Sequence, residues 1–152
     1  MKMWSVFILM CLIPKLGLTD IVELRPLDFG QIAITSNASV SELTMDHLGN
    51  LNFDEHIRIM SRGEPGIYLA SGFAGNVQLF VTALVQNRVM NPGVVSGEFV
   101  SLTALDTPVS INTRPDGTAE IPVGGTIATS GSGSMAFADA VYVSNIQVTI
   151  NF

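Results

Sequence analysis

From Asp20 to Phe152 the sequence alternates short runs rich in β-branched residues with clusters of Gly, Pro, Asn and Asp. No segment there shows the 3.6-residue apolar period of an amphipathic helix, and the apolar residues of 77–85 recur with the period of two that is typical of a strand. Many short strands separated by turn residues predict an all-β fold, either a sandwich or a barrel. The predicted strands are 21–25, 28–34, 39–45, 56–60, 67–71, 77–85, 98–105, 118–122, 126–130 and 141–152.

Four turns are predicted between these strands. Residues 62–66, 91–93 and 114–117 each combine Pro with a Gly that can adopt positive φ. Gly124 and Gly125 predict a tight turn without Pro. Residues 129–134, a Ser/Gly run, predict a flexible loop that is too short to separate two domains.

The last predicted strand shows the clearest alternation in the chain. Its polar residues fall on one face, and its apolar residues fall on the other. The apolar face consists of Tyr142, Ile146, Val148, Ile150 and Phe152. A terminal strand of this kind must pair with neighbours, because an unpaired apolar edge promotes aggregation.

Residues 1–19 have the features of a secretory signal peptide. A positive start precedes an apolar run over 3–13, which is shorter than the roughly 20 residues that span a bilayer. Cleavage within 16–20 would leave 20–152 as one domain, called the mature chain below, without a transmembrane segment. The alternative is an uncleaved N-terminal anchor. Cys11 lies inside the apolar run, so we expect it to leave with the signal.

The mature chain is acidic and lacks three residue types. Every Lys, Cys and Trp of the sequence precedes Asp20. Loss of Lys2 and Lys15 leaves five Arg against thirteen acids, so the formal net charge becomes 5 − 13 = −8. This composition excludes disulfides, a Cys nucleophile, a thiolate metal site and a Lys Schiff base or cross-link. It also argues against nucleic acid as a partner, because binding a polyanion needs clustered positive charge.

The two histidines raise the question of a metal site. His47 and His56 lie near three acids, and imidazole and carboxylate groups are metal ligands. A polar loop and an exposed strand end explain the same residues, so we expect no metal. Residues 50–54 resemble the start of a calcium loop, but Glu55 replaces its Gly and Ser61 replaces its final acid. Weak calcium binding to the acidic surface is left open.

No residue pattern points to catalysis. Ser130, Ser132 and Ser134 flank glycines, but none occupies a Gly-x-Ser-x-Gly motif. Residues 124–126 lack the Lys of a phosphate-binding loop. We therefore expect a protein that is not an enzyme, with no catalytic residue and no cofactor; an unrecognised hydrolase is the weaker alternative. Asn37 begins a formal N-glycosylation acceptor.

Four segments together resemble a bacterial family known as domain of unknown function 4402. They are 27–32 (LDFGQI), 63–68 (GEPGIY), 116–127 (DGTAEIPVGGTI) and the closing segment 138–152. They cover most of the mature chain in consistent order. The resemblance implies a small secreted protein with an antiparallel β-sandwich of the immunoglobulin or pilin type.

That family is similar in outline to subunits of chaperone–usher fimbriae, which associate by β-strand addition. For this chain, the similarity implies that Ile21, Val22 and Leu24 act in strand exchange together with the terminal strand. Pro26 ends this first segment and favours a strand boundary there. The alternative reading of the residues is that 20–25 pairs within its own domain as the first strand.

These observations predict a secreted structural or adhesive surface protein, most closely a fimbrial-type subunit. Its expected partners are further copies of itself or a periplasmic chaperone or usher. Its expected location is the periplasm, the cell surface or an extracellular fimbrium. The alternatives are a self-contained monomeric binding domain and a small outer-membrane β-barrel, which the signal, the size and the terminal Phe152 also fit.

Overall fold

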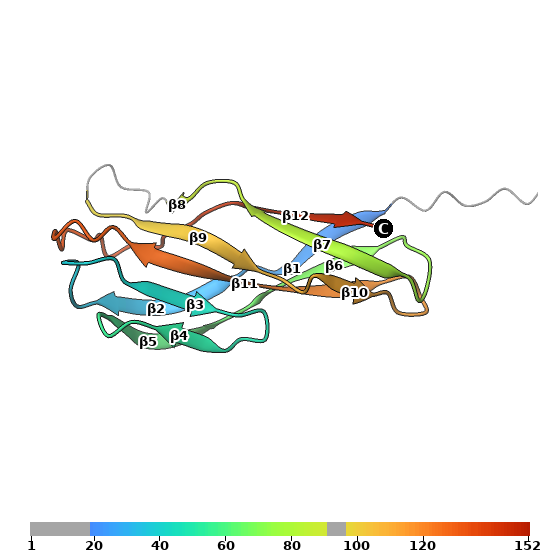
Figure 1. Ribbon diagram of the computed structural model, residues 1–152, viewed down its shortest axis with the longest axis horizontal. Coiled ribbons are helices and arrows are strands. Elements are labelled where there is room, and N and C mark those ends of the chain that lie inside the picture. Colours follow the sequence, from blue (N-terminus) through green and yellow to red (C-terminus); the bar gives the residue numbers. More distant parts are fainter. Residues whose placement is uncertain (1–18, 91–96) are drawn as a thin grey trace, which may run out of the picture.

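The computed structural model describes residues 19–90 and 97–152, which form strands and loops and contain no helix (Figure 1). The all-β prediction is confirmed. The predicted signal peptide and the predicted turn at 91–93 lie outside the described residues. The strands are β1 (Asp20–Arg25), β2 (Asp28–Ile34), β3 (Glu42–Met45), β4 (Leu51–Phe53), β5 (Ile57–Glu64), β6 (Gly66–Ser71), β7 (Gln78–Val85), β8 (Val89–Met90), β9 (Val100–Asp106), β10 (Ser110–Asn112), β11 (Ala119–Thr129) and β12 (Ile146–Asn151).

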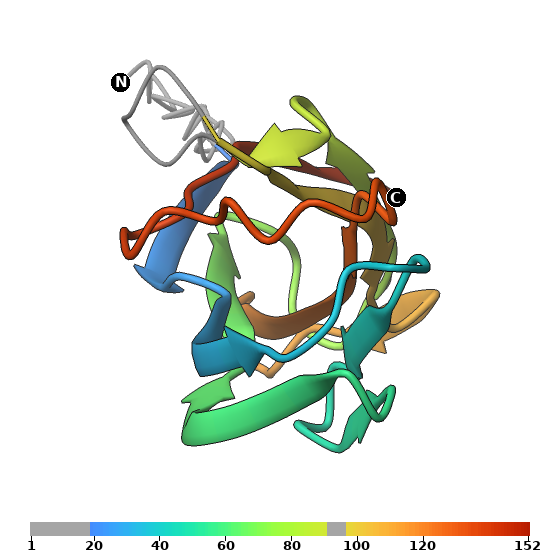
Figure 2. The same ribbon diagram turned by 90° about the vertical axis from the view of Figure 1, so that its left-hand side faces the viewer.

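The strands form three antiparallel sheets. The largest has the order β1-β6-β11-β3-β4, with β9 also paired to β11 and β8 paired to β9. The second has the order β10-β7-β12, and the third consists of β2 and β5. Figure 2 looks along the long axis and shows the sheets curling around a common interior.

β11 is the central strand of the fold. Its first half pairs with β6, and its second half pairs with β3 on one side and β9 on the other. The predicted turn at Gly124 and Gly125 is wrong, because both residues lie inside this continuous strand. A Cβ on Gly124 would lie 2.3 Å from the Met45 carbonyl oxygen. The absence of a side chain at Gly124 therefore lets the β3–β4 hairpin approach β11 closely.

Pro26 and Pro65 separate two strand pairs that belong to different sheets. β1 pairs with β6 on one side of these prolines, and β2 pairs with β5 on the other. The turn predicted at 62–66 is wrong, because the chain runs on from β5 into β6 with only Pro65 between them. Pro lacks the N–H that a ladder needs, so the pairing breaks there and the strands change sheet.

Gly30 and Gly63 hold the two strands of the β2–β5 pair close together. A Cβ on Gly63 would lie 2.0 Å from the carbonyl oxygen of Asp28, and one on Gly30 would lie 2.0 Å from that of Ser61. Gly30 also has a φ of 81°, within the left-handed region that favours glycine. Any larger residue at either position would push the backbones apart.

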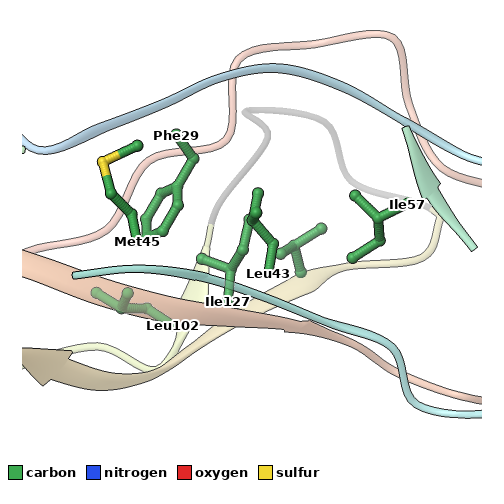
Figure 3. Packing of buried hydrophobic residues seen from close by; sticks show 7 residues of the cluster. Phe29, Leu43, Met45, Ile57, Leu102 and Ile127 are labelled. Carbon is green, nitrogen blue, oxygen red and sulfur yellow. The ribbon is translucent and has the colours of Figure 1, made fainter. Parts of the chain in front are cut away.

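Two groups of buried side chains fill the interior. Cluster 1 contains Phe29, Leu43, Met45, Ile57, Val100, Leu102 and Ile127, six of which Figure 3 labels. Cluster 2 contains Tyr68, Ala70, Leu79, Val81, Ala119, Ile121 and Val123. Leu105 and Ile146 pack against both clusters, so they join the two halves of the interior.

Several predicted boundaries change. The predicted strands 118–122 and 126–130 are parts of β11, and the last strand begins at Ile146 instead of 141. The short strands β4, β8 and β10 were not predicted. The turn at 114–117 is confirmed, with Gly117 at a φ of 79° and a 2.9 Å hydrogen bond from its N–H to the Arg114 carbonyl.

Candidate functional site

β12 is an edge strand with one apolar face. It pairs with β7 from Ile146 to Asn151, and no strand within the described ranges pairs with its other edge. Ile146, Val148 and Ile150 pack against cluster 2, whereas Gln147 and Asn151 are exposed. The alternation expected from the sequence is therefore present over this part of the terminal segment.

Tyr142 and Phe152 lie outside β12, which corrects the prediction that one strand carries all five apolar residues. The Tyr142 hydroxyl donates to the carbonyl of Ala138 at 3.2 Å and accepts from its N–H at 3.0 Å, and this closes a loop. Phe152 is 83% exposed, and its ring meets that of Phe73 edge-on, with centroids 5.4 Å apart. Gln86 N–H donates to the carbonyl of Asn145 at 3.0 Å, directly before the first register pair of β12 with β7, Ile146 with Val85.

β1 is the second edge strand, and it pairs with β6 of its own chain. Ile21 points inward and packs against cluster 2. Val22 and Leu24 are 46% and 55% exposed. A β-bulge falls between Glu23 and Arg25, so Leu24 is the residue without a partner in the register. Of the three β1 residues among those predicted for strand exchange, Ile21 packs against the interior, and Val22 and Leu24 are on the surface.

Polar contacts hold β1 to the neighbouring strand. The Tyr68 hydroxyl donates to Glu23 Oε2 at 2.8 Å. Burial and this contact with Glu23 raise the pKa of Tyr68 above its ordinary range. Arg25 pairs through Nη1 with Glu64 at 2.6 Å and donates through Nε to the Pro65 carbonyl at 2.9 Å.

The two edge strands border the same part of the interior. Ile21 of β1 packs against cluster 2 from one sheet, and Val148 and Ile150 of β12 do so from another. The first residue of β1, Asp20, pairs with Ser71, two positions before Phe73, the ring that Phe152 contacts. In Figure 1 the C-terminus and the start of β1 lie at the same end of the long axis, and Figure 2 shows them apart across that end. Both strands thus border cluster 2 without lying side by side.

A cleft of about 1180 Å³ opens between β2 and the segment 135–142. Ile32, Val100 and Ile127 line it, so it reaches cluster 1, and Tyr142 lies on its other side. The cleft is lined by both polar and apolar groups. It is a second surface at which this fold could hold a ligand.

The residues considered for a metal site do not converge. His47 Nδ1 lies 2.7 Å from Asp106 Oδ2, whereas His56 faces Glu55 at 3.7 Å. Over 19–90 and 97–152 no group of three or more His, Cys, Asp or Glu side chains is placed to hold a metal ion. Residues 51–53 of the calcium-loop resemblance form β4.

The Ser/Gly run predicted as a flexible loop is held by a polar network that the sequence did not reveal. Asn37, which is 1% exposed, donates to Ser130 Oγ at 2.9 Å and to the Ser134 carbonyl at 2.7 Å. Ser132 Oγ donates to Glu98 Oε1 at 2.6 Å, and Ser130 Oγ donates to Oε2. The hydrogen bond from Ser130, and to a lesser extent the one from Ser132, lowers the pKa of Glu98. The glycosylation acceptor at Asn37 is therefore inaccessible in the folded protein.

Comparison with family models, curated proteins and solved structures finds no match for this chain. Within the part of the chain that the structure describes, no helix is both long enough and apolar enough to cross a bilayer. The site is therefore interpreted from its own residues.

Proposed function

We propose that the protein is a secreted structural or adhesive surface subunit that associates by β-strand addition. The observation that carries the proposal is the pair of edge strands, β1 and β12, that border one apolar cluster. An exposed strand edge presents unpaired N–H and C=O groups that another chain can pair with. Within the described residues this protein offers two such edges, one on β1 and one on β12, in two sheets that border the same cluster.

The side chains of β12 favour pairing with another strand. Its sequence, IQVTIN, contains no charged residue and no Pro. Proteins that prevent pairing at a free edge use charges, Pro or bulges there. β1 has such features, since it contains Glu23, Arg25 and a bulge. Of the two edges, β12 is thus the one whose own residues do not oppose strand addition.

The wider proposal follows the sequence resemblance. The fold is a β-sandwich of the pilin type, residues 1–19 are a cleaved signal, and a periplasmic chaperone or usher, or a second copy, supplies the partner strand. The antiparallel sheets and the terminal apolar strand support this proposal. No enzymatic step is part of the proposed function.

The test uses matched variants of β12 in the full chain. Val148→Asp with Ile150→Asp places two charges on the face that packs against cluster 2. Gln147→Asp with Thr149→Asp places the same charges on the opposite face. We expect the first pair to abolish association or export and the second pair to allow folding. Unaltered export and association of the first pair would contradict the proposal.

The cleft beside β2 favours a second candidate function, a self-contained monomeric binding domain. Ligand sites are concave, and their polar groups are few and placed among apolar ones. Sedimentation of the purified protein over a range of concentrations separates the two functions. A monomer at every concentration favours the binding domain, and concentration-dependent oligomers favour the surface subunit.

A further inference from the structure

The sheet β10-β7-β12 has an outer face that is distinct from its strand edges. In the central strand β7, Leu79 and Val81 are buried, so the residues that alternate with them point outward. Register partners in antiparallel strands share a face, so hydroxyl and amide side chains of β10 and β12 lie beside them. These neighbours are called the uncharged face below, together with Gln78, Phe80, Thr82 and Leu84 of β7.

The absence of charge is specific to this sheet. The sequences of its strands are SIN, QLFVTALV and IQVTIN, and none contains a charged residue. All five Arg and all thirteen acids of the mature chain lie in other segments. A partner that docks flat on the uncharged face therefore meets no ion in these strands whose hydration must be removed.

Cross-strand hydrogen bonds orient the amide groups of this face. Gln78 Nε2 donates to Ser110 Oγ at 2.9 Å, and Gln86 Nε2 donates to Gln147 Oε1. Each amide has further donors or acceptors. Within the described residues, Gln78 Oε1 and Gln147 Nε2 make no other hydrogen bond, and both side chains are exposed.

Two apolar side chains lie among these polar groups. Phe80 is 49% exposed and Leu84 is 54% exposed. Phe80 lies between its register partners Ser110 and Asn151. An exposed aromatic ring with hydroxyl and amide groups beside it can contact a ligand that has an apolar face and a polar rim.

Resting on the adhesive role in the proposed function, we propose that the uncharged face binds a neutral polysaccharide. Sugar hydroxyls donate and accept hydrogen bonds, and so do the hydroxyl and amide side chains of this face. A pyranose ring also has a C–H face, which fits the exposed ring of Phe80. An anionic polysaccharide would instead be repelled by the net charge of −8 on the mature chain.

A protein partner fits this surface less well. The centres of protein–protein interfaces are enriched in aromatic residues, Met and Arg and are depleted in Ser. The three strands contain one aromatic residue, Phe80, and neither Met nor Arg. Their polar side chains recur at about 4.8 Å across the sheet and about 7 Å along each strand, which is a regular array for a chain of repeating sugar units.

The test measures retention of the purified protein on insoluble cellulose, chitin and mannan, with heparin and polygalacturonate gels as anionic probes. We expect retention on at least one neutral probe and none on the anionic ones. Because no charge takes part, this retention should not change when NaCl rises from about 0.05 M to about 0.5 M. Absence of retention on every neutral probe, or retention that salt removes, overturns the polysaccharide site.

Variants on β7 locate the site without altering the edge of β12. Thr82→Asp with Leu84→Asp adds two charges to the uncharged face and should abolish retention. Phe80→Ala should weaken binding about tenfold, and it keeps the test valid where the charged pair fails to fold. The matched control is Asn52→Asp with Ala104→Asp, which adds the same charge at exposed positions of β4 and β9 and should not change retention. Full retention of both face variants overturns the site, and so does an equal loss in the control.

Sedimentation of the same protein separates the polysaccharide site from strand addition. Oligomers that no neutral probe retains overturn the site and leave strand addition standing. A monomer that a neutral probe retains overturns strand addition and leaves the site standing. Oligomers that dissociate in Thr82→Asp with Leu84→Asp, without any retention of the wild type, show that the face binds a second copy and overturn the polysaccharide site.

Discussion

The hydroxyl of Tyr68 donates a 2.8 Å hydrogen bond to the carboxylate of Glu23. Tyr68 belongs to cluster 2, and Glu23 belongs to the edge strand β1. The contact therefore ties an edge strand of the large sheet to the interior. It also places a titratable phenol beside a carboxylate, so the strength of this contact depends on pH.

Tyr68→Phe should lower the stability of the fold at neutral pH. It should also make that stability fall less as the pH rises into the alkaline range. The pKa of Tyr68 is higher in the folded state than in the unfolded state. Its contribution to stability is therefore complete below the unfolded-state pKa and is lost as the pH rises from there through the folded-state pKa. We expect a deficit of about 1 kcal/mol for the variant near neutrality. Denaturant unfolding of both proteins between about pH 8 and about pH 11 should show this deficit shrinking. A constant deficit would contradict the assignment.

Glu98→Gln should make folding less sensitive to acid. Hydrogen bonds from Ser130 and Ser132 lower the folded-state pKa of Glu98, so its contribution is complete above the unfolded pKa and is lost as pH falls through the folded one. The variant should melt below the wild type near neutral pH, and the two melting temperatures should converge toward about pH 3. A constant difference between the two melting temperatures over this pH range would show that the loop hydroxyls do not stabilise the Glu98 carboxylate.

Gly63→Ala should be strongly destabilising, because the new Cβ would lie 2.0 Å from the Asp28 carbonyl oxygen. We expect a loss of about 3 kcal/mol or more, within the range of backbone strain and overpacking. Gly133→Ala is the matched control. Gly133 has a φ of 86° but no atom within 4 Å of the added Cβ, so only about 1 kcal/mol should be lost. Equal losses in urea unfolding would contradict the close approach of β2 and β5.

Phe152→Ala should destabilise the fold much less than truncation of a buried ring. The ring is exposed and makes one edge-on contact with Phe73, a pair worth about 0.5–1.5 kcal/mol. Phe29→Ala is the contrast, because Phe29 is buried in cluster 1 and its truncation should cost about 3–5 kcal/mol. Thermal unfolding of both variants measures the difference. A large loss for Phe152→Ala would mean that the terminal ring is part of the interior.

Much of the secondary structure follows from local sequence patterns. The alternation in 77–85 predicts β7 to within one residue, and β2 and β12 carry the apolar periods expected of them. The positions of Gly and Pro predicted turns less well than the apolar alternation predicted strands. Gly124, Gly125 and Pro65 look like turn residues, but the structure uses them for close approach and for a change of sheet. Which use prevails depends on neighbours that are remote in sequence, such as Met45 beside Gly124.

In the candidate site, too, some features follow from the sequence and others only from the fold. Ile21, Val148 and Ile150 could be selected from the sequence as apolar residues near the two ends of the mature chain. Their meeting on cluster 2, and the assignment of Val22 and Leu24 to the surface, required the pairing of β1 with β6. Tyr142 and Phe152 shared the sequence period of the last strand but lie outside it.

Local sequence therefore determined that this chain forms strands and which side of several of them is apolar, because those properties depend on residues one or two positions apart. Tertiary structure decided which strands became neighbours and which edges of β1 and β12 have no partner strand within the described residues. Strand pairing joins distant residues through backbone N–H and C=O groups, and those groups are the same in nearly every residue. Their partners are selected only when the whole interior is packed.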